Sequence, residues 1–318
     1  MPLFNVYPLY NVTPVSAEGV YVYDKNNTKY LDLYGGHAVI SIGHGHPEYV
    51  EAITNQVSKL GFYSNAIQNP LQRQLADKIE ILSGCKDYEL FLCSSGAEAN
   101  ENALKLASFK TQKSRVIAFK NGFHGRTSAA VAVTDNKNII APINAQQKVT
   151  ILDLNDIESV KTELEKGDVC AVIVEFIQGV GGLDQATADF FEQLDLLCKS
   201  NNTLFIADEV QSGYGRSGKF FAFQYYKVTP DIISIAKGMG NGFPIGGILI
   251  HPNIEAKLGM LGTTFGGNHL ACAAGLSVLN VIEDENLMDN VITISDYFIK
   301  IAKTIPQIKN IKGRGLML

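Results

Sequence analysis

Short apolar runs recur along the chain from about residue 88 onward, and stretches with a helical pattern separate several of them. One such stretch is ADFFEQLDLLCKSNN, at 188–202. The runs are ELFLCS (89–94), RVIAFK (115–120), VCAVIVE (169–175), TLFIADE (203–209), DIISIAK (231–237) and GGILI (246–250). Nearly continuous apolar strands that alternate with helices are typical of a parallel sheet covered on both faces. The pattern therefore predicts an α/β fold with a mainly parallel central sheet flanked by helices.

Three of these runs end in a polar, reactive side chain: Glu175, Asp208 and Lys237. Ligands of open α/β sheets bind beyond the carboxyl ends of the strands, so we expect the chemistry at this edge. Lys237 leads into the glycine-rich bend KGMGNGFPIGG, and a lysine in a desolvated crevice is a nucleophile candidate. Asp208 is a candidate metal ligand, base or partner of a cation, and a purely structural ion pair is the alternative.

A third candidate feature is the predicted helix start in CSSGAEANENALKLA, at 93–107. Ser95 and Glu98 have the S-x-x-E spacing of a capping box, and Gly96 lets backbone N–H groups approach a ligand closely. A helix N-terminus binds phosphate well, although an ordinary capped helix gives the same pattern. Together with Lys237 and Asp208, this feature fits pyridoxal phosphate, whose aldehyde, ring nitrogen and phosphate need these three groups.

The first 45 residues have a different pattern. The stretch GVYVYDKNNTKYLDLYGG (19–36) predicts a β-hairpin with its turn at 24–28. We expect a smaller α+β domain made of residues 1–45 and 276–318, and a large cofactor-binding domain at 46–275. The final stretch IKGRGLML (311–318) begins a new apolar run, so we expect the C-terminal part of the small domain to be truncated.

The composition of the chain argues against several classes of binding partner. The 318 residues carry a net charge of −5, with 46% hydrophobic and 19% charged residues, which argues against a nucleic acid or an anionic membrane as partner. The five cysteines form no C-x-x-C pair, and the six histidines have no zinc spacing, so we expect reduced thiols and no metal site. The N-terminus has no secretory pattern, and no apolar run is long enough to span a bilayer. We therefore expect a cytoplasmic protein.

Six motifs taken together resemble the class III pyridoxal-phosphate-dependent aminotransferases, most closely the acetylornithine aminotransferase group. They are SIGHGHP (41–47), SSGAEANENALKLA (94–107), FHGRT (123–127), ADEVQSGYGRSG (207–218), SIAKGMGNGFPIGG (234–247) and GTTFGGNHLACAAG (262–275). The resemblance implies the type I fold of pyridoxal-phosphate enzymes, pyridoxal 5′-phosphate as cofactor and a homodimer with shared active sites. It further implies transamination between an N-acylornithine and 2-oxoglutarate in arginine biosynthesis.

The resemblance also implies roles for individual residues. Lys237 corresponds to the lysine that binds the cofactor's aldehyde and moves the proton, and Asp208 to the partner of the ring nitrogen. Arg126 corresponds to the clamp of the substrate carboxylate, since its planar fork matches a carboxylate, and Thr263 to a second substrate contact across the subunit interface. The remaining cofactor contacts are expected from Ser95, Gly96, Ala97, Phe123, Glu209, Val210 and Gln211, and from Thr264 of the neighbouring subunit.

One departure from the family concerns the stretch EFIQGVGG, at 175–182. The family usually has a proline at position 176 and a glutamate at position 180, where this chain has Phe176 and Val180. The loss of a negative charge near the substrate favours a more anionic donor, so N-succinylornithine is a candidate beside N-acetylornithine. Another class III activity, on ornithine or 4-aminobutyrate, and an inactive cofactor-fold subunit remain alternatives.

Overall fold

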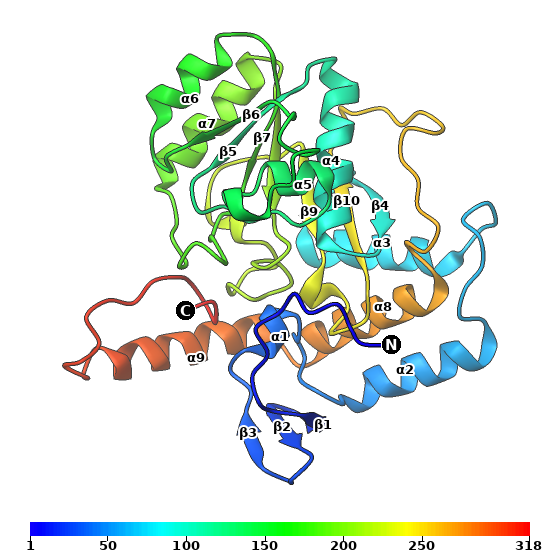
Figure 1. Ribbon diagram of the computed structural model, residues 1–318. Helices are drawn as coiled ribbons and strands as arrows, with labels where there is room; N and C mark the ends of the chain where they lie inside the picture. Colours follow the sequence, from blue (N-terminus) through cyan, green and yellow to red (C-terminus); the bar gives the residue numbers. More distant parts are fainter.

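A seven-stranded sheet forms the centre of the computed structural model, which describes residues 1–318 (Figure 1). The strand order is β4-β10-β9-β8-β7-β5-β6. The strands are β4 (Glu89–Cys93), β5 (Arg115–Phe119), β6 (Val149–Leu152), β7 (Val169–Val174), β8 (Leu204–Asp208), β9 (Ile232–Ile235) and β10 (Gly246–Ile250). Strand β10 is antiparallel to both of its neighbours, and all other neighbouring pairs are parallel. The prediction of a mainly parallel sheet is confirmed.

The sequence pattern was incomplete at two strands. It groups β10 with the parallel strands, but only residues 236–245 separate β9 from β10. A parallel crossover needs roughly a dozen or more residues, so the chain turns back and pairs antiparallel. The pattern also missed β6, whose four residues are all half-buried at the edge of the sheet and form no continuous apolar run.

Helices cover both faces of the sheet, and apolar side chains alternate between the two layers. Helix α4 (Gly96–Thr111) packs on one face against β7, β8, β9 and β10. On that side, Ile173 and Ile206 belong to one buried cluster, whereas their neighbours Val172 and Phe205 belong to the cluster on the opposite face. Helix α7 (Ala188–Ser200) packs against β8 and against α6 (Ile157–Leu164) (Figure 1). This two-sided burial explains why the strands are apolar at every position.

A second layer of helices lies below the sheet in Figure 1. Helix α8 (His269–Asp284) packs against α2 (Pro47–Lys59) and α3 (Pro70–Ser83), and α9 (Leu287–Ala302) follows it. Helix α8 runs across the domain boundary expected at 275, so the two parts of the chain are joined by a continuous helix and not by a linker. None of the helices combines the length and apolar character that a bilayer span requires.

The N-terminal segment forms a separate three-stranded antiparallel sheet of β1 (Pro14–Glu18), β2 (Tyr21–Asp24) and β3 (Lys29–Leu31), away from the central sheet (Figure 1). Asp24 closes the turn between β2 and β3, because its Oδ1 accepts the N–H groups of Asn26 and Thr28 at 2.8 and 2.9 Å. The predicted hairpin is therefore confirmed. The short elements that complete the chain are α1 (Gly35–Ala38), α5 (Ser128–Ala132), and the 3₁₀ helices η1 (Lys137–Ile139), η2 (Ala222–Tyr225) and η3 (Lys237–Met239).

Candidate active site

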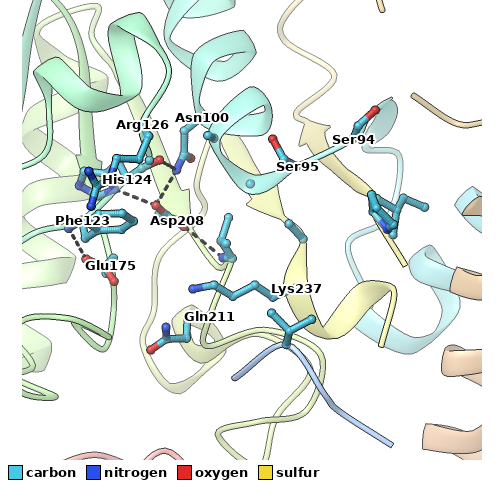
Figure 2. Close-up of a pocket in the computed structure, with 18 of the residues that line it drawn as sticks. Ser94, Ser95, Asn100, Phe123, His124, Arg126, Glu175, Asp208, Gln211 and Lys237 are labelled. Atoms are coloured by element: carbon cyan, nitrogen blue, oxygen red, sulfur yellow. Dashed lines mark hydrogen bonds and ion pairs between the residues drawn. The ribbon is translucent and has the colours of Figure 1, made fainter. Parts of the chain in front are cut away.

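The three reactive strand ends meet at one edge of the sheet, as expected. Asp208 is the last residue of β8, Glu175 directly follows β7, and Lys237 lies two residues beyond β9. All three line one cavity of ≈350 Å³. Figure 2 shows the Lys237 side chain pointing toward the space bounded by Asp208, Phe123 and Gln211.

The N-terminus of helix α4 forms another wall of this cavity. Ser95 is the N-cap, and its Oγ accepts the N–H of Glu98 at 3.2 Å. The Glu98 carboxylate accepts the N–H of Ser94 at 2.6 Å, so the expected capping box is closed one residue earlier than predicted. Gly96 and Ala97 line the cavity, and their N–H groups belong to the first turn, where a helix offers no acceptors of its own. A Cβ at Gly96 would lie 2.6 Å from Val210 Cγ1, so only glycine fits there.

Asp208 is the most strongly held group in the site. It is 3% exposed, and its Oδ2 accepts hydrogen bonds from His124 Nδ1 and Asn100 Nδ2, both at 2.7 Å. Its Oδ1 accepts the N–H of Val210 at 3.1 Å. Burial lowers the pKa of His124, but the hydrogen bond and charge of Asp208 outweigh burial and raise it overall. Three donors therefore fix Asp208 in place, and a carboxylate fixed in this way is suited to face a cationic nitrogen.

Lys237 has the opposite environment. Burial lowers its pKa, the nearby charges of Asp208 and Glu175 partly offset this effect, and Arg216 lowers it further. The neutral amine, which is the nucleophilic form, is thus more accessible than in an exposed lysine. Its backbone has a φ of 46°, in the left-handed region that non-glycine residues rarely adopt. Such conformations concentrate at functional sites, and here the conformation turns the chain out of β9 toward η3.

Four other residues that the sequence predicts for the site lie around these groups in the cavity wall. Phe123, Val210 and Gln211 line the cavity. Arg126 also lines it, with its side chain open to solvent, and it forms none of the chain's ion pairs. An unpaired guanidinium at a cavity mouth is available to bind an anionic substrate bidentately.

The carboxylate of Glu209 does not line the cavity, so the expected cofactor contact of this residue stays a prediction. The carboxylate is buried on the other side of the chain, where it accepts hydrogen bonds from Ser212 Oγ at 2.6 Å and from the N–H groups of Ala222 and Phe223 at 3.0 and 2.8 Å. The physical reason is the alternation of side chains along an extended segment. Because Asp208 faces the cavity, the next residue faces away, and it caps η2 instead.

Thr263 and Thr264 do not line this cavity either. Both lie in the loop between β10 and α8, where Thr263 Oγ1 accepts the N–H of Gly266 at 3.1 Å and Thr264 is exposed. This placement leaves both free to act on a neighbouring subunit, so their roles stay predictions. Val180, the departure from the family pattern, is 66% exposed and also lies outside the cavity lining.

Sequence reasoning missed two members of the site and gave a third no role. Asn100 and His124 both donate to Asp208, and the sequence offers little signal for either, because each lies inside a motif already explained by a neighbour. Glu175 was recognised only as the end of an apolar run. It is buried, lines the cavity and accepts two backbone N–H groups.

The residues present fit pyridoxal phosphate. The helix N-terminus supplies unpaired N–H groups for a phosphate, Asp208 supplies a fixed anion for a ring nitrogen, and Lys237 supplies a buried amine for an aldehyde. No group of three or more His, Cys, Asp or Glu side chains is arranged to hold a metal ion. The fold and the site thus define a pyridoxal-phosphate-dependent enzyme of fold type I.

Comparison with known proteins identifies the family. The model of the class III aminotransferases matches residues 5–318, so the chain belongs to this family of pyridoxal-phosphate-dependent aminotransferases. It is 38% identical to an acetylornithine aminotransferase of Bacillus subtilis, over 99% of this chain and 83% of that relative. It is 40% identical to one of Caldanaerobacter subterraneus, with the same two coverages.

Solved structures agree with this assignment. The ornithine aminotransferase of Toxoplasma gondii, solved with partial occupancy of pyridoxal phosphate at its active site, matches with a TM-score of 0.89 and 30% identity, over 96% of this chain and 76% of that chain. An S-selective transaminase from an Arthrobacter species matches with a TM-score of 0.89 and 25% identity, over 98% of this chain and 78% of that chain. Pyridoxal phosphate is accordingly the cofactor of this chain.

Proposed function

We propose that this chain is an N-acetylornithine aminotransferase, which transfers the side-chain amino group of N-acetylornithine to 2-oxoglutarate. The products are N-acetylglutamate semialdehyde and glutamate, and the reaction belongs to arginine biosynthesis. The observation that carries the chemistry is the meeting of Lys237, Asp208 and the α4 N-terminus in one cavity. The choice of donor rests on the relatives named acetylornithine aminotransferase, at 38–40% identity over nearly the whole chain.

Six residues of the cavity wall would hold the cofactor, besides Lys237. The N–H groups of Gly96 and Ala97 would bind its phosphate beside the Ser95 cap, Val210 and Phe123 would pack on its ring, and Gln211 would bind the ring hydroxyl. Asp208, which His124 and Asn100 hold in place, would face the ring nitrogen and favour its protonated form. When bound, pyridoxal phosphate supplies an electron-withdrawing ring that acidifies the C–H bond next to the donor nitrogen.

The chain's own residues then orient the substrate and move the proton. Arg126 binds the carboxylate of the donor and later that of 2-oxoglutarate. Lys237 Nζ, whose pKa burial lowers, takes the proton from the acidified carbon as a general base and returns it as a general acid. A lysine with an unperturbed pKa would stay protonated at neutral pH and would perform the first of these steps poorly.

The test is a panel of amino donors added to the purified holoenzyme. N-Acetylornithine should bleach the visible absorption band of the cofactor, and 2-oxoglutarate should restore it. Lys237→Ala should abolish this band, because the cofactor can then form no covalent bond to residue 237. The same substitution should reduce turnover by several orders of magnitude. Bleaching by ornithine or 4-aminobutyrate, with none by N-acetylornithine, would move the chain to another class III activity. A chain that binds no cofactor at all would be an inactive subunit.

The succinylated donor remains a separate prediction from Val180. Since Val180 is exposed and lies outside the cavity lining, its missing charge acts on the donor only at a distance. Comparing kcat/KM for N-acetylornithine and N-succinylornithine decides the point. A clear preference for the acetyl donor would reject the expectation of a more anionic substrate.

We further propose a homodimer in which Thr264 reaches the phosphate, and Thr263 the substrate, of the neighbouring subunit. The supporting observation is that both threonines lie outside the cavity of their own chain. Mixing inactive Lys237→Ala subunits with Thr264→Ala subunits tests this directly. If Thr264 acts across the interface, hybrid dimers contain one intact site, and random mixing should recover about a quarter of the wild-type activity. No gain on mixing would place Thr264 in its own subunit's site or outside any site.

A further inference from the structure

Glu175 is a second buried carboxylate at the catalytic edge of the sheet, and none of the roles above uses it. Strands β7 and β8 pair in parallel with Val174 opposite Ala207, so the residues that follow, Glu175 and Asp208, lie side by side. Glu175 is 7% exposed and Asp208 is 3% exposed, and both line the cavity.

The two carboxylates have different partners. Asp208 is held by the side chains of His124 and Asn100. Glu175 accepts only backbone groups: its Oε1 accepts the N–H of Phe123 and its Oε2 accepts the N–H of Gly179, each at 2.9 Å. A buried carboxylate without an ion-pair partner is costly, so a residue placed here should have a task that its hydrogen bonds perform.

One N–H donor belongs to the loop that carries Phe123, and the other belongs to the loop after β7, which lies against the side chain of Gln211. Phe123 lies within the loop 120–127 between β5 and α5, and Figure 2 marks the hydrogen bond from its backbone N–H to Glu175. Gly179 lies directly under Gln211, since a Cβ at this glycine would be 2.0 Å from Gln211 Oε1. One carboxylate therefore connects the backbone of Phe123 with the backbone that supports Gln211.

We propose that Glu175 is a positioning residue of this active site, whose two oxygens fix the Phe123 loop and the Gly179 loop so that Phe123 and Gln211 hold the cofactor ring in one orientation. The proposal rests on the function proposed above, because it relies on the cofactor-binding roles of those two side chains. Glu175 does not itself react.

The charge of Glu175 adds a second, measurable consequence. Burial and the charge of Asp208 raise the pKa of Glu175, His124 and the two backbone N–H groups lower it, and together these effects place it at about 7. The ionised fraction raises the pKa of Lys237, which also faces Asp208 and Arg216. Removing the charge at Glu175 should therefore shift the titration of the Lys237 nitrogen to lower pH.

The experiment compares Glu175→Gln with Asp231→Asn in the holoenzyme. Asp231 is also buried and also accepts a backbone N–H, that of Phe205 at 2.9 Å, but it directly precedes β9, at the opposite end of this strand from Lys237, and does not line the cavity. The readouts are the visible circular dichroism of the bound cofactor, its dissociation constant from titration of the apoenzyme, and the pH midpoint of the visible band. None of these needs an amino donor.

Glu175→Gln should weaken cofactor binding by about tenfold. The reason is that the glutamine NH₂ group would face a backbone N–H at the position where a carboxylate oxygen accepts that N–H in the wild type. It should also reduce the visible circular dichroism, move the pH midpoint down, and lower kcat more than it raises KM. Asp231→Asn should lose stability and leave the cofactor signals unchanged. Equal cofactor signals in Glu175→Gln, Asp231→Asn and wild type would overturn the proposal.

Gly179→Ala decides the matter if Glu175→Gln does not fold. It keeps the carboxylate but displaces Gln211, so it should change the visible circular dichroism in the same direction, and a wild-type spectrum would refute the proposed link. An inactive wild type with normal cofactor signals would refute the proposed donor and leave this test intact.

Discussion

Replacing Asn100 with alanine removes a group that the sequence motifs did not single out, and its cost can be worked from the structure. Asn100 is 1% exposed, and its Nδ2 donates to Asp208 Oδ2 at 2.7 Å and to the carbonyl oxygen of His124 at 2.8 Å. Its Oδ1 has no hydrogen-bond partner, so deleting that oxygen breaks nothing. The loss is therefore confined to one bond to a charged group and one to a backbone carbonyl, both buried.

A hydrogen bond to a charged group contributes about 1.5–3 kcal/mol and a neutral one about 1 kcal/mol, so Asn100→Ala should cost about 2.5–4 kcal/mol. With an unfolding entropy of about 2 cal/mol/K per residue, a chain of this length should lose about 4–6 °C in Tm. Loss of the Asn100 hydrogen bond should also weaken cofactor binding, because only His124 and the Val210 N–H then fix the Asp208 carboxylate.

The assay is thermal unfolding of the apoenzyme and the holoenzyme, with cofactor titration of the apoenzyme. Asn102→Ala is the matched control, since Asn102 lies on the same helix and its Nδ2 donates only to the carbonyl oxygen of Glu98, at 2.8 Å. The control should lower Tm by no more than about 2 °C, because it loses a single neutral hydrogen bond of about 1 kcal/mol. Equal Tm values for the two variants would refute the view that Asn100 holds the Asp208 network together.

Three further predictions concern the cavity and its surroundings. Gly96→Ala drives a Cβ to 2.6 Å from Val210 Cγ1, so it should weaken cofactor binding by at least about tenfold in an apoenzyme titration. Burial raises the pKa of Glu209 from 4.5 to about 7, so the folded state binds its proton more tightly than the unfolded state, and stability should fall as pH rises from about 4.5 to 7. Glu209→Gln should flatten this part of the Tm–pH profile, and an unchanged slope would contradict the assignment. Val180→Glu should raise kcat/KM for N-acetylornithine relative to kcat/KM for N-succinylornithine. An unchanged ratio of the two values would show that the side chain at position 180 does not affect the choice of donor.

The local sequence pattern was enough to predict which strand ends and which helix start meet at the site. The apolar runs before Asp208 and Lys237 are long enough to be buried on both faces, and parallel strands bring their carboxyl ends to one edge. The Ser95 cap and Gly96 gave the helix start in the same way, because capping depends on a few consecutive residues. These contacts are local or follow from the sheet, so the sequence by itself determined them.

The tertiary structure decided the contacts between segments distant in the chain. Asn100, His124 and Asp208 come from three different elements, and nothing in their local sequence states that they share one oxygen. The direction of β10 and the outward turn of Glu209 depended on connection length and on side-chain alternation past the strand end. A hydrogen bond between distant residues is selected by packing of the whole sheet, and for that reason it appears only when the chain is folded.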